Sequence, residues 1–190
     1  AEAHAINMAT AKALKDKFGE GYKGVLYGGF MATANGVNLI EYNARFGDPE
    51  AMNVLSIIES DFIELCSAIA DGTLNQTDVQ FANKATVCKY AVPEGYPDSP
   101  IKGEPIDVSG VSNPQSLFYA SVDIQGGQLV EAGSRTVAVV GMADSIYEAE
   151  AVAEKGVSAV KGPLFHRTDI GTDVVVQKRI DHMSSLRAKC

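Results

Sequence analysis

The chain has 190 residues, with 24 acidic and 16 basic side chains, a formal net charge of −8 and a sequence pI near 4.8. This length allows one large or two small hydrophobic cores, and the acidic balance argues against a nucleic-acid-binding surface, because a polyanion needs a basic face. No apolar run approaches the length of a membrane span, so we expect a soluble protein with no membrane partner.

The first elements predict a helix followed by a β-hairpin. Residues 3–18 carry apolar and small side chains at helical spacing and end at a glycine. Two apolar segments, residues 25–33 and 37–43, flank the dipeptide Asn35-Gly36, which is a strong turn signal. We therefore expect two antiparallel strands joined by a tight turn.

The end of the second strand carries a group of polar side chains. Because side chains alternate along a strand, Glu41 and Asn43 leave the same face, and we expect them opposite Gly28 and Gly29. A carboxylate and an amide one pleat apart can share a small hard cation such as Mg²⁺, which usually keeps water or phosphate ligands as well. Arg45 follows with the same parity if the strand extends that far, and its guanidinium suits phosphate or carboxylate. The pattern predicts a site for metal and phosphate.

The segment Asp48-Pro49-Glu50 predicts the start of the next helix. Asp48 can cap free N–H groups, Pro49 suits the first helical position, and Glu50 complements the positive end of the helix dipole. A further helix starts after Asp61 and ends at Gly72, and Cys66 on its apolar stripe is expected in the core.

Residues 75–83 are polar and aperiodic, so we predict two domains, 1–82 and 83–190. The second is expected to form strands and two helices, the first helix opening with a capping box at Ser145. Its expected strands cover residues 84–92, 117–124, 128–132 and 135–141. The three cysteines, Cys66, Cys88 and Cys190, form no CxxC motif, which argues against disulfides or a zinc site and favours the cytoplasm.

Residues 41–50 read EYNARFGDPE. They resemble the signature E-[FY]-N-x-R-F-G-D-P-E of one enzyme family, the phosphoribosylamine–glycine ligases of the ATP-grasp superfamily, and this motif is the specific one. Residues 24–31 resemble its G-V-L-Y-A-G-[LF]-M strand, with Gly28 in place of alanine. Residues 133–139 and 165–171 are similar to its G-G-R-V and R-x-D-I-G segments.

The resemblance implies a fold and a reaction. The fold is α+β: the C-terminal half of an ATP-grasp domain, an antiparallel sheet with helices, followed by a small mixed β-sheet domain with two helices. The implied reaction is the ligation of glycine to 5-phosphoribosylamine with ATP, through glycyl phosphate, in purine biosynthesis. The family is longer than this chain, so the resemblance also implies a fragment that needs the N-terminal part of the enzyme and is inactive alone.

The resemblance also assigns residue roles. Glu41 and Asn43 would hold Mg²⁺, or Mn²⁺ in its place, together with ATP, and Arg45 would stabilise the transferred phosphoryl group. Asp48 and Glu50 would contact the amine substrates, although capping is an equal alternative for Asp48. Tyr27 stands where many ATP-grasp enzymes place a first acidic metal ligand, and the glycine ligases share this tyrosine.

The roles of two further residues stay open, and two alternative functions remain to be considered. Arg167 and Asp169 could contact another domain or the substrate cleft, or could simply pair and order their loop. The alternative functions are another ATP-grasp carboxylate–amine ligase and a non-catalytic nucleotide-binding or interaction module.

Overall fold

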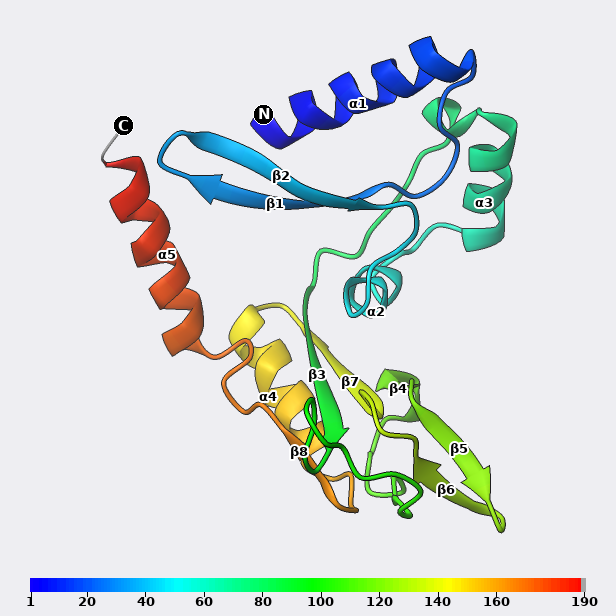
Figure 1. The fold of residues 1–190 in the computed structure, drawn as a ribbon, viewed down its shortest axis with the longest axis vertical. Helices are drawn as coiled ribbons and strands as arrows, with labels where there is room; N and C mark the ends of the chain where they lie inside the picture. Colours follow the sequence, from blue (N-terminus) through cyan, green and yellow to red (C-terminus); the bar gives the residue numbers. More distant parts are fainter. Residues whose placement is uncertain (189–190) are drawn as a thin grey trace. The chain divides into compact units, whose positions relative to one another are not determined.

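The computed structural model describes residues 1–188 and divides into two compact units (Figure 1). The first unit comprises residues 1–51, 58–82 and 177–188, and the second comprises residues 52–57 and 83–176. The predicted α+β class is confirmed, since both units combine helices with antiparallel strands. The domain limits 1–82 and 83–190 stay a prediction, and Cys190 lies outside the described residues.

The first unit is built on a β-hairpin covered by a helix. Strands β1 (Tyr27–Thr33) and β2 (Gly36–Asn43) pair antiparallel across the predicted turn. Helix α1 (Glu2–Phe18) lies beside them, and the Tyr42 hydroxyl bonds to Asn7 Oδ1 of this helix at 2.8 Å (Figure 1). Helix α3 (Phe62–Asp71) and the short 3₁₀ helix η1 (Leu74–Gln76) complete the unit.

The ends of α3 follow from its flanking residues. The Asp61 side chain accepts hydrogen bonds from the backbone N–H groups of Ile63 and Glu64, as an N-cap should. Gly72 ends the helix in the left-handed conformation, with φ of 74°. Cys66, however, is exposed, and the expectation that it lies in the core is wrong, because α3 buries the stripe through Leu65 and Ala68 instead.

The second unit is a four-stranded sheet with a helix on it. The strand order is β4-β7-β3-β8, formed by β3 (Ala85–Pro93), β4 (Leu117–Tyr119), β7 (Val137–Ala143) and β8 (Leu164–His166). Every pairing among these described strands is antiparallel, whereas a mixed sheet was expected. A separate hairpin joins β5 (Val122–Gln125) to β6 (Gln128–Glu131) across the predicted Gly-Gly turn.

Helix α4 (Ile146–Val157) packs against β3 and β7 and forms the core of this unit. The Ser145 hydroxyl accepts from the backbone N–H of Glu148 and donates to the Glu148 carboxylate, so the N-cap half of the predicted capping box is confirmed. Ala149 and Ala153 are fully buried on the helix face that meets the sheet. Gly141 of β7 makes this close packing feasible, since a Cβ there would overlap the Ala149 carbonyl.

Three elements differ from the sequence-based expectation. The predicted strand 117–124 is split into β4 and β5, which pair with different partners, and β8 was not predicted. Helix α2 (Glu50–Leu55) is shorter than its apolar pattern suggested. The remaining described elements are the 3₁₀ helix η2 (Pro114–Ser116) and α5 (Asp173–Arg187), which has no buried residue.

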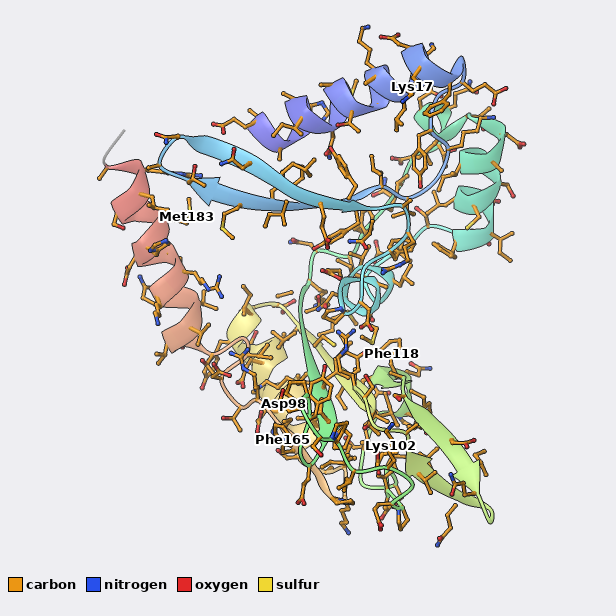
Figure 2. All side chains as sticks on the ribbon, viewed as in Figure 1. Lys17, Asp98, Lys102, Phe118, Phe165 and Met183 are labelled. Atoms are coloured by element: carbon orange, nitrogen blue, oxygen red, sulfur yellow. The ribbon has the colours of Figure 1, made fainter. Side chains whose placement is uncertain are left out.

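The two units differ in how much they bury. The clusters of buried apolar side chains lie in the second unit, whereas among the described residues of the first unit only Gly47, Leu65 and Ala68 are buried. Figure 2 draws the side chains of both units as sticks. None of the described helices has the length and apolar character required to cross a membrane.

Candidate functional site

The end of β2 brings Glu41 and Asn43 together. Asn43 Nδ2 donates to Glu41 Oε1 at 3.3 Å, so the two side chains meet on one face of the hairpin. Glu41 is exposed and Asn43 is half-buried. A carboxylate and an amide are therefore adjacent and accessible at the point where the strand ends.

The register of the hairpin corrects one expectation. Glu41 lies opposite Gly29, as expected, but Asn43 lies opposite Tyr27, and Gly28 faces Tyr42. The reason is the period of the strand, since residues two apart on one strand face residues two apart on its neighbour. Strand β2 also contains a bulge. The neighbouring residues Gly29 and Phe30 of β1 pair with Glu41 and Leu39, so β2 has one extra residue between its two partners.

Arg45 does not occupy the position that strand parity predicted. Strand β2 ends at Asn43, and Arg45 lies in a bend beyond it. Its side chain is exposed, and its Nη1 donates to the backbone carbonyl of Phe46 at 2.6 Å. The parity argument for Arg45 is therefore wrong, and its role as a phosphate-binding group stays a prediction.

Glu50 lies in the first turn of α2 and turns back toward the hairpin. The Glu50 carboxylate beside the Tyr27 hydroxyl, followed by burial and the negative charge of Glu41, raises the pKa of Tyr27. Glu50 Oε2 is buried and has no hydrogen-bond partner among the described atoms. Asp48 is exposed before the helix, which begins at Glu50, and its choice between capping and substrate contact stays open.

The donor set suits a magnesium ion shared with a phosphate. Glu41 and Asn43 supply one carboxylate and one amide, and rotating the Asn43 amide turns its oxygen toward the same point as the carboxylate. Within residues 1–188, no group of three or more His, Cys, Asp or Glu side chains is arranged to hold a metal. The pair therefore fits an ion that takes its other ligands from a nucleotide and water.

The second unit contains a charge cluster that sequence reasoning missed. The Lys89 side chain is fully buried, and its Nζ donates to Glu150 Oε1 and Glu154 Oε2, each at 2.6 Å, and to the Thr168 carbonyl at 2.9 Å. His166 Nε2 lies 2.9 Å from the other Glu154 oxygen. The available signal was a lysine within an apolar strand combined with two glutamates one helical turn apart.

The pKa values in this cluster reflect its paired charges. Burial alone lowers the pKa of Lys89, but the hydrogen bonds with Glu150 and Glu154 outweigh burial and raise it. Burial alone raises the pKa of Glu154, but the bonds to Lys89 and His166 outweigh it and lower the pKa. The cluster is therefore most stable with Lys89 and Glu154 both ionised.

Arg167 and Asp169 form a two-pronged ion pair in the loop before α5. Arg167 Nε and Nη2 donate to the two Asp169 oxygens at 2.9 and 2.7 Å. Both side chains are largely exposed. The pair agrees with an ordered loop, and its contact with another domain or with substrate stays a prediction.

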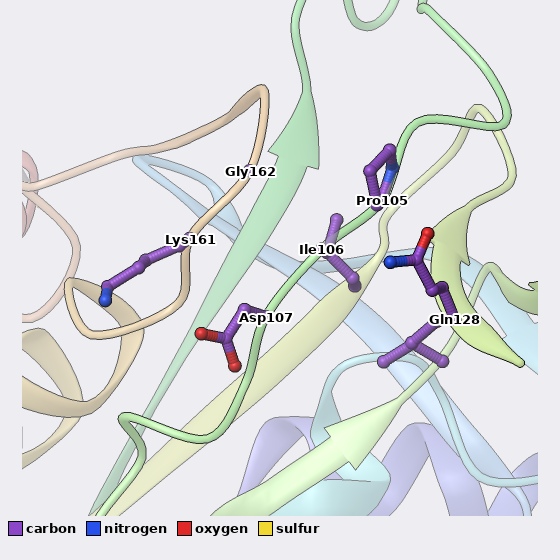
Figure 3. Close-up of a pocket in the computed structure, with 7 residues that line it drawn as sticks. Pro105, Ile106, Asp107, Gln128, Lys161 and Gly162 are labelled. Carbon is purple, nitrogen blue, oxygen red and sulfur yellow. The ribbon is translucent and has the colours of Figure 1, made fainter.

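The second unit also contains a cavity of about 340 Å³ that includes none of the predicted site residues. Figure 3 shows its lining, with Asp107 and Lys161 on one side and Gln128 on the other. The Asp107 carboxylate bonds to Ser109, which lowers its pKa. The polar side chains that line this cavity are exposed. None of them belongs to the hairpin site, so the cavity is not part of that site.

Comparison with known proteins matches both units to one family. Residues 86–173 match the family model described as phosphoribosylglycinamide synthetase, C domain, and residues 2–51 match the model described as phosphoribosylglycinamide synthetase, ATP-grasp (A) domain. Each unit thus has a counterpart in the same multidomain family.

Individual relatives agree with this match. A phosphoribosylamine–glycine ligase of Methanocaldococcus jannaschii is 54% identical over 96% of this chain and 41% of its own length. One of Methanocella arvoryzae is 49% identical over 98% of this chain and 43% of its own length. A crystal structure of the Thermotoga maritima phosphoribosylamine–glycine ligase superposes with a TM-score of 0.69 and 28% identity, over 82% of this chain and 39% of the other.

The chain thus spans about two fifths of the length of these curated relatives. The matches cover both units and occur in the order in which the sequence motifs occur. The chain belongs to the phosphoribosylglycinamide synthetase family.

Proposed function

We propose that this chain is part of a phosphoribosylamine–glycine ligase, which joins glycine to 5-phosphoribosylamine with ATP in purine biosynthesis. The observation that carries the proposal is the adjacent Glu41–Asn43 pair at the end of β2, within the segment that matches the ATP-grasp domain. The relatives at about half identity are named for this reaction. A cytoplasmic location is part of the proposal.

The reaction has two steps. The glycine carboxylate attacks the γ-phosphorus of ATP, which forms glycyl phosphate and releases ADP. The amine of phosphoribosylamine then attacks the acyl carbon, phosphate leaves, and the nitrogen loses a proton. No covalent enzyme intermediate is needed, so the residues act by holding charge and orienting substrates.

Glu41 and Asn43 would hold Mg²⁺, or Mn²⁺, at the nucleotide phosphates. When bound, this ion neutralises charge on the phosphate oxygens during transfer. Arg45, one bend further on, can swing its exposed guanidinium away from the Phe46 carbonyl and donate to the transferred phosphoryl group.

Asp48 and Glu50 are the carboxylates proposed to receive the amines of the substrates. Both lie beyond the end of β2, in the part of the motif that carries FGDPE. Arg167 and Asp169 are proposed to contact another domain or the cleft of the complete enzyme. The N-terminal residues that the longer relatives possess would supply the rest of the nucleotide site.

An activity assay with two chain lengths tests the proposal. A protein of the relatives' full length containing this sequence should convert ATP, glycine and phosphoribosylamine to ADP and glycinamide ribonucleotide at an ordinary enzymatic rate, on the order of 1 to 1000 per second. The 190-residue chain alone should fold and give no measurable product. Product from the short chain at a similar rate would contradict the proposal that the N-terminal part of the enzyme is needed for activity.

A further inference from the structure

The loop between β8 and α5, residues 167–172, is bonded to a buried lysine. The Lys89 side chain of β3 is fully buried, and its Nζ donates to the Thr168 backbone carbonyl at 2.9 Å. The same Nζ donates to Glu150 and Glu154 of α4, which hold it in place. The lysine therefore joins the loop backbone to helix α4.

Two further contacts fix the ends of this loop. His166, the last residue of β8, lies with its Nε2 2.9 Å from a Glu154 oxygen. At the other end, the Thr172 hydroxyl donates to the Asp169 carbonyl at 2.8 Å. The backbone of this loop is thus held at its start, its middle and its end, although residues 167–169 are exposed.

This loop carries the guanidinium of Arg167. Its Nε and Nη2 donate to the two Asp169 oxygens, so one edge of the guanidinium is fixed. The Arg167 side chain is 67% exposed, and its Nη1 has no hydrogen-bond acceptor in the described part of the chain. The second edge, formed by Nη1 and the other N–H of Nη2, can therefore donate two parallel hydrogen bonds to an oxyanion.

Stability alone does not explain the buried charges around Lys89. Burying charged groups has a cost that their mutual attraction often fails to offset, and a well-packed apolar side chain at such a position is often as stabilising. An apolar side chain could not, however, donate to the Thr168 carbonyl. The lysine is therefore better suited to holding the loop than to strengthening the core.

We propose that Lys89 is a positioning residue that fixes the backbone of residues 167–169, so that Arg167 presents its second guanidinium edge to a substrate oxyanion. This inference rests on the proposed ligase function, in which ATP, phosphoribosylamine and glycine each carry a phosphate or carboxylate group. A planar guanidinium edge binds either group through two hydrogen bonds. Because one edge binds one group, losing this contact should weaken the binding of one substrate and spare the other two.

Steady-state kinetics of Arg167→Lys and Lys89→Met in the full-length ligase test the proposal. Arg167→Lys keeps the charge but loses the planar fork, and Lys89→Met removes the bond to Thr168. Both variants should raise the KM for the same substrate about five- to tenfold, while kcat and the other two KM values stay within about twofold. The substrate whose KM rises identifies the oxyanion.

A matched control separates positioning from a general loss of stability. Glu131 is also a fully buried charged side chain of the second unit, and it accepts from the backbone N–H groups of Glu104 and Gly133, outside the loop. Glu131→Gln should lower the midpoint of urea unfolding, as Lys89→Met does, but leave all three KM values unchanged. An equal KM rise in Glu131→Gln would show a merely structural effect and overturn the assignment. If Lys89→Met does not fold, the double variant with Glu150→Gln, which also removes a buried negative charge, takes its place.

A double variant tests whether Lys89 acts through Arg167. Lys89→Met should then add nothing to the KM in an Arg167→Lys background. Additive effects, unchanged KM values in either single variant, or rises for different substrates in the two variants would overturn the assignment. A wild-type protein that makes no glycinamide ribonucleotide would contradict the ligase function and the inference with it, whereas an active wild type with any of those three results contradicts the Lys89 assignment alone.

Discussion

At the scale of single residues, the sequence pattern predicted the positions of some side chains of the candidate site but not of others. Strand alternation predicted that Glu41 and Asn43 meet, and their side chains are adjacent. The same alternation failed for Arg45, because β2 ends two residues earlier and alternation ends with it. The effect of Glu50 on the pKa of Tyr27 could not be predicted, because it depends on the path of the chain between β2 and α2.

Arg45 gives a test at this scale. Arg45→Lys in the full-length ligase should lower kcat at least tenfold, because a lysine cannot donate two parallel hydrogen bonds to a phosphoryl group. Turnover and KM for ATP measured beside Arg187→Lys, an exposed arginine of α5, provide the comparison. Wild-type turnover in the Arg45→Lys variant would show that a diffuse positive charge is sufficient.

The Lys89 cluster predicts a pH dependence of stability. The folded pKa of Glu154 is lowered, so its contribution to stability is complete above its unfolded value of 4.5 and is lost as the pH falls through the folded pKa. Urea unfolding of the chain should therefore show a midpoint that decreases below about pH 4.5. The Glu154→Gln variant should show a smaller decrease in the urea midpoint below about pH 4.5. The control Glu104→Gln, outside the cluster, should show the same decrease as the wild type. An equal decrease in the wild type and in Glu154→Gln would contradict the role assigned to Glu154.

At the scale of elements, local signals predicted most of the fold and tertiary pairing decided the rest. The Asn-Gly and Gly-Gly turns, the Asp61 cap and the Ser145 capping box mark ends that depend on neighbouring residues only. Segment 117–124 reads as one strand, but its halves pair with β7 and β6, and such pairing is not encoded in period or propensity. Strand β8 has three residues, too few for a pattern to be recognised.

The contact between α4 and β7 gives a test at this scale. Gly141→Ala should lower the free energy of unfolding of the second unit by about 1–3 kcal/mol, because the added methyl group meets the α4 backbone. Gly21→Ala is the control, since a Cβ at Gly21 meets nothing within 4 Å. Denaturant unfolding measures both variants, and equal midpoints would contradict the close packing of helix on sheet.

At the scale of the whole molecule, the distribution of buried residues agrees with the proposal that the first unit supplies only part of a nucleotide site. The second unit has its own clusters of buried apolar residues, whereas the first buries little among its described residues and presents the Glu41–Asn43 pair. The motif predicted that pair and the family, since its ten residues occur together at one strand end. Composition and hydrophobic period alone would have predicted only an acidic α+β protein.

The most direct measurement of the central claim is the Mg²⁺ dependence of the rate in Glu41→Gln, made in the full-length ligase. If Glu41 is an anionic metal ligand, the variant should keep its fold, lose at least tenfold in rate and need more Mg²⁺ for half-maximal activity. Asn43→Ala should behave in the same way but more mildly, because it removes a neutral ligand. A Glu41→Gln enzyme with wild-type rate and wild-type Mg²⁺ dependence would contradict the account.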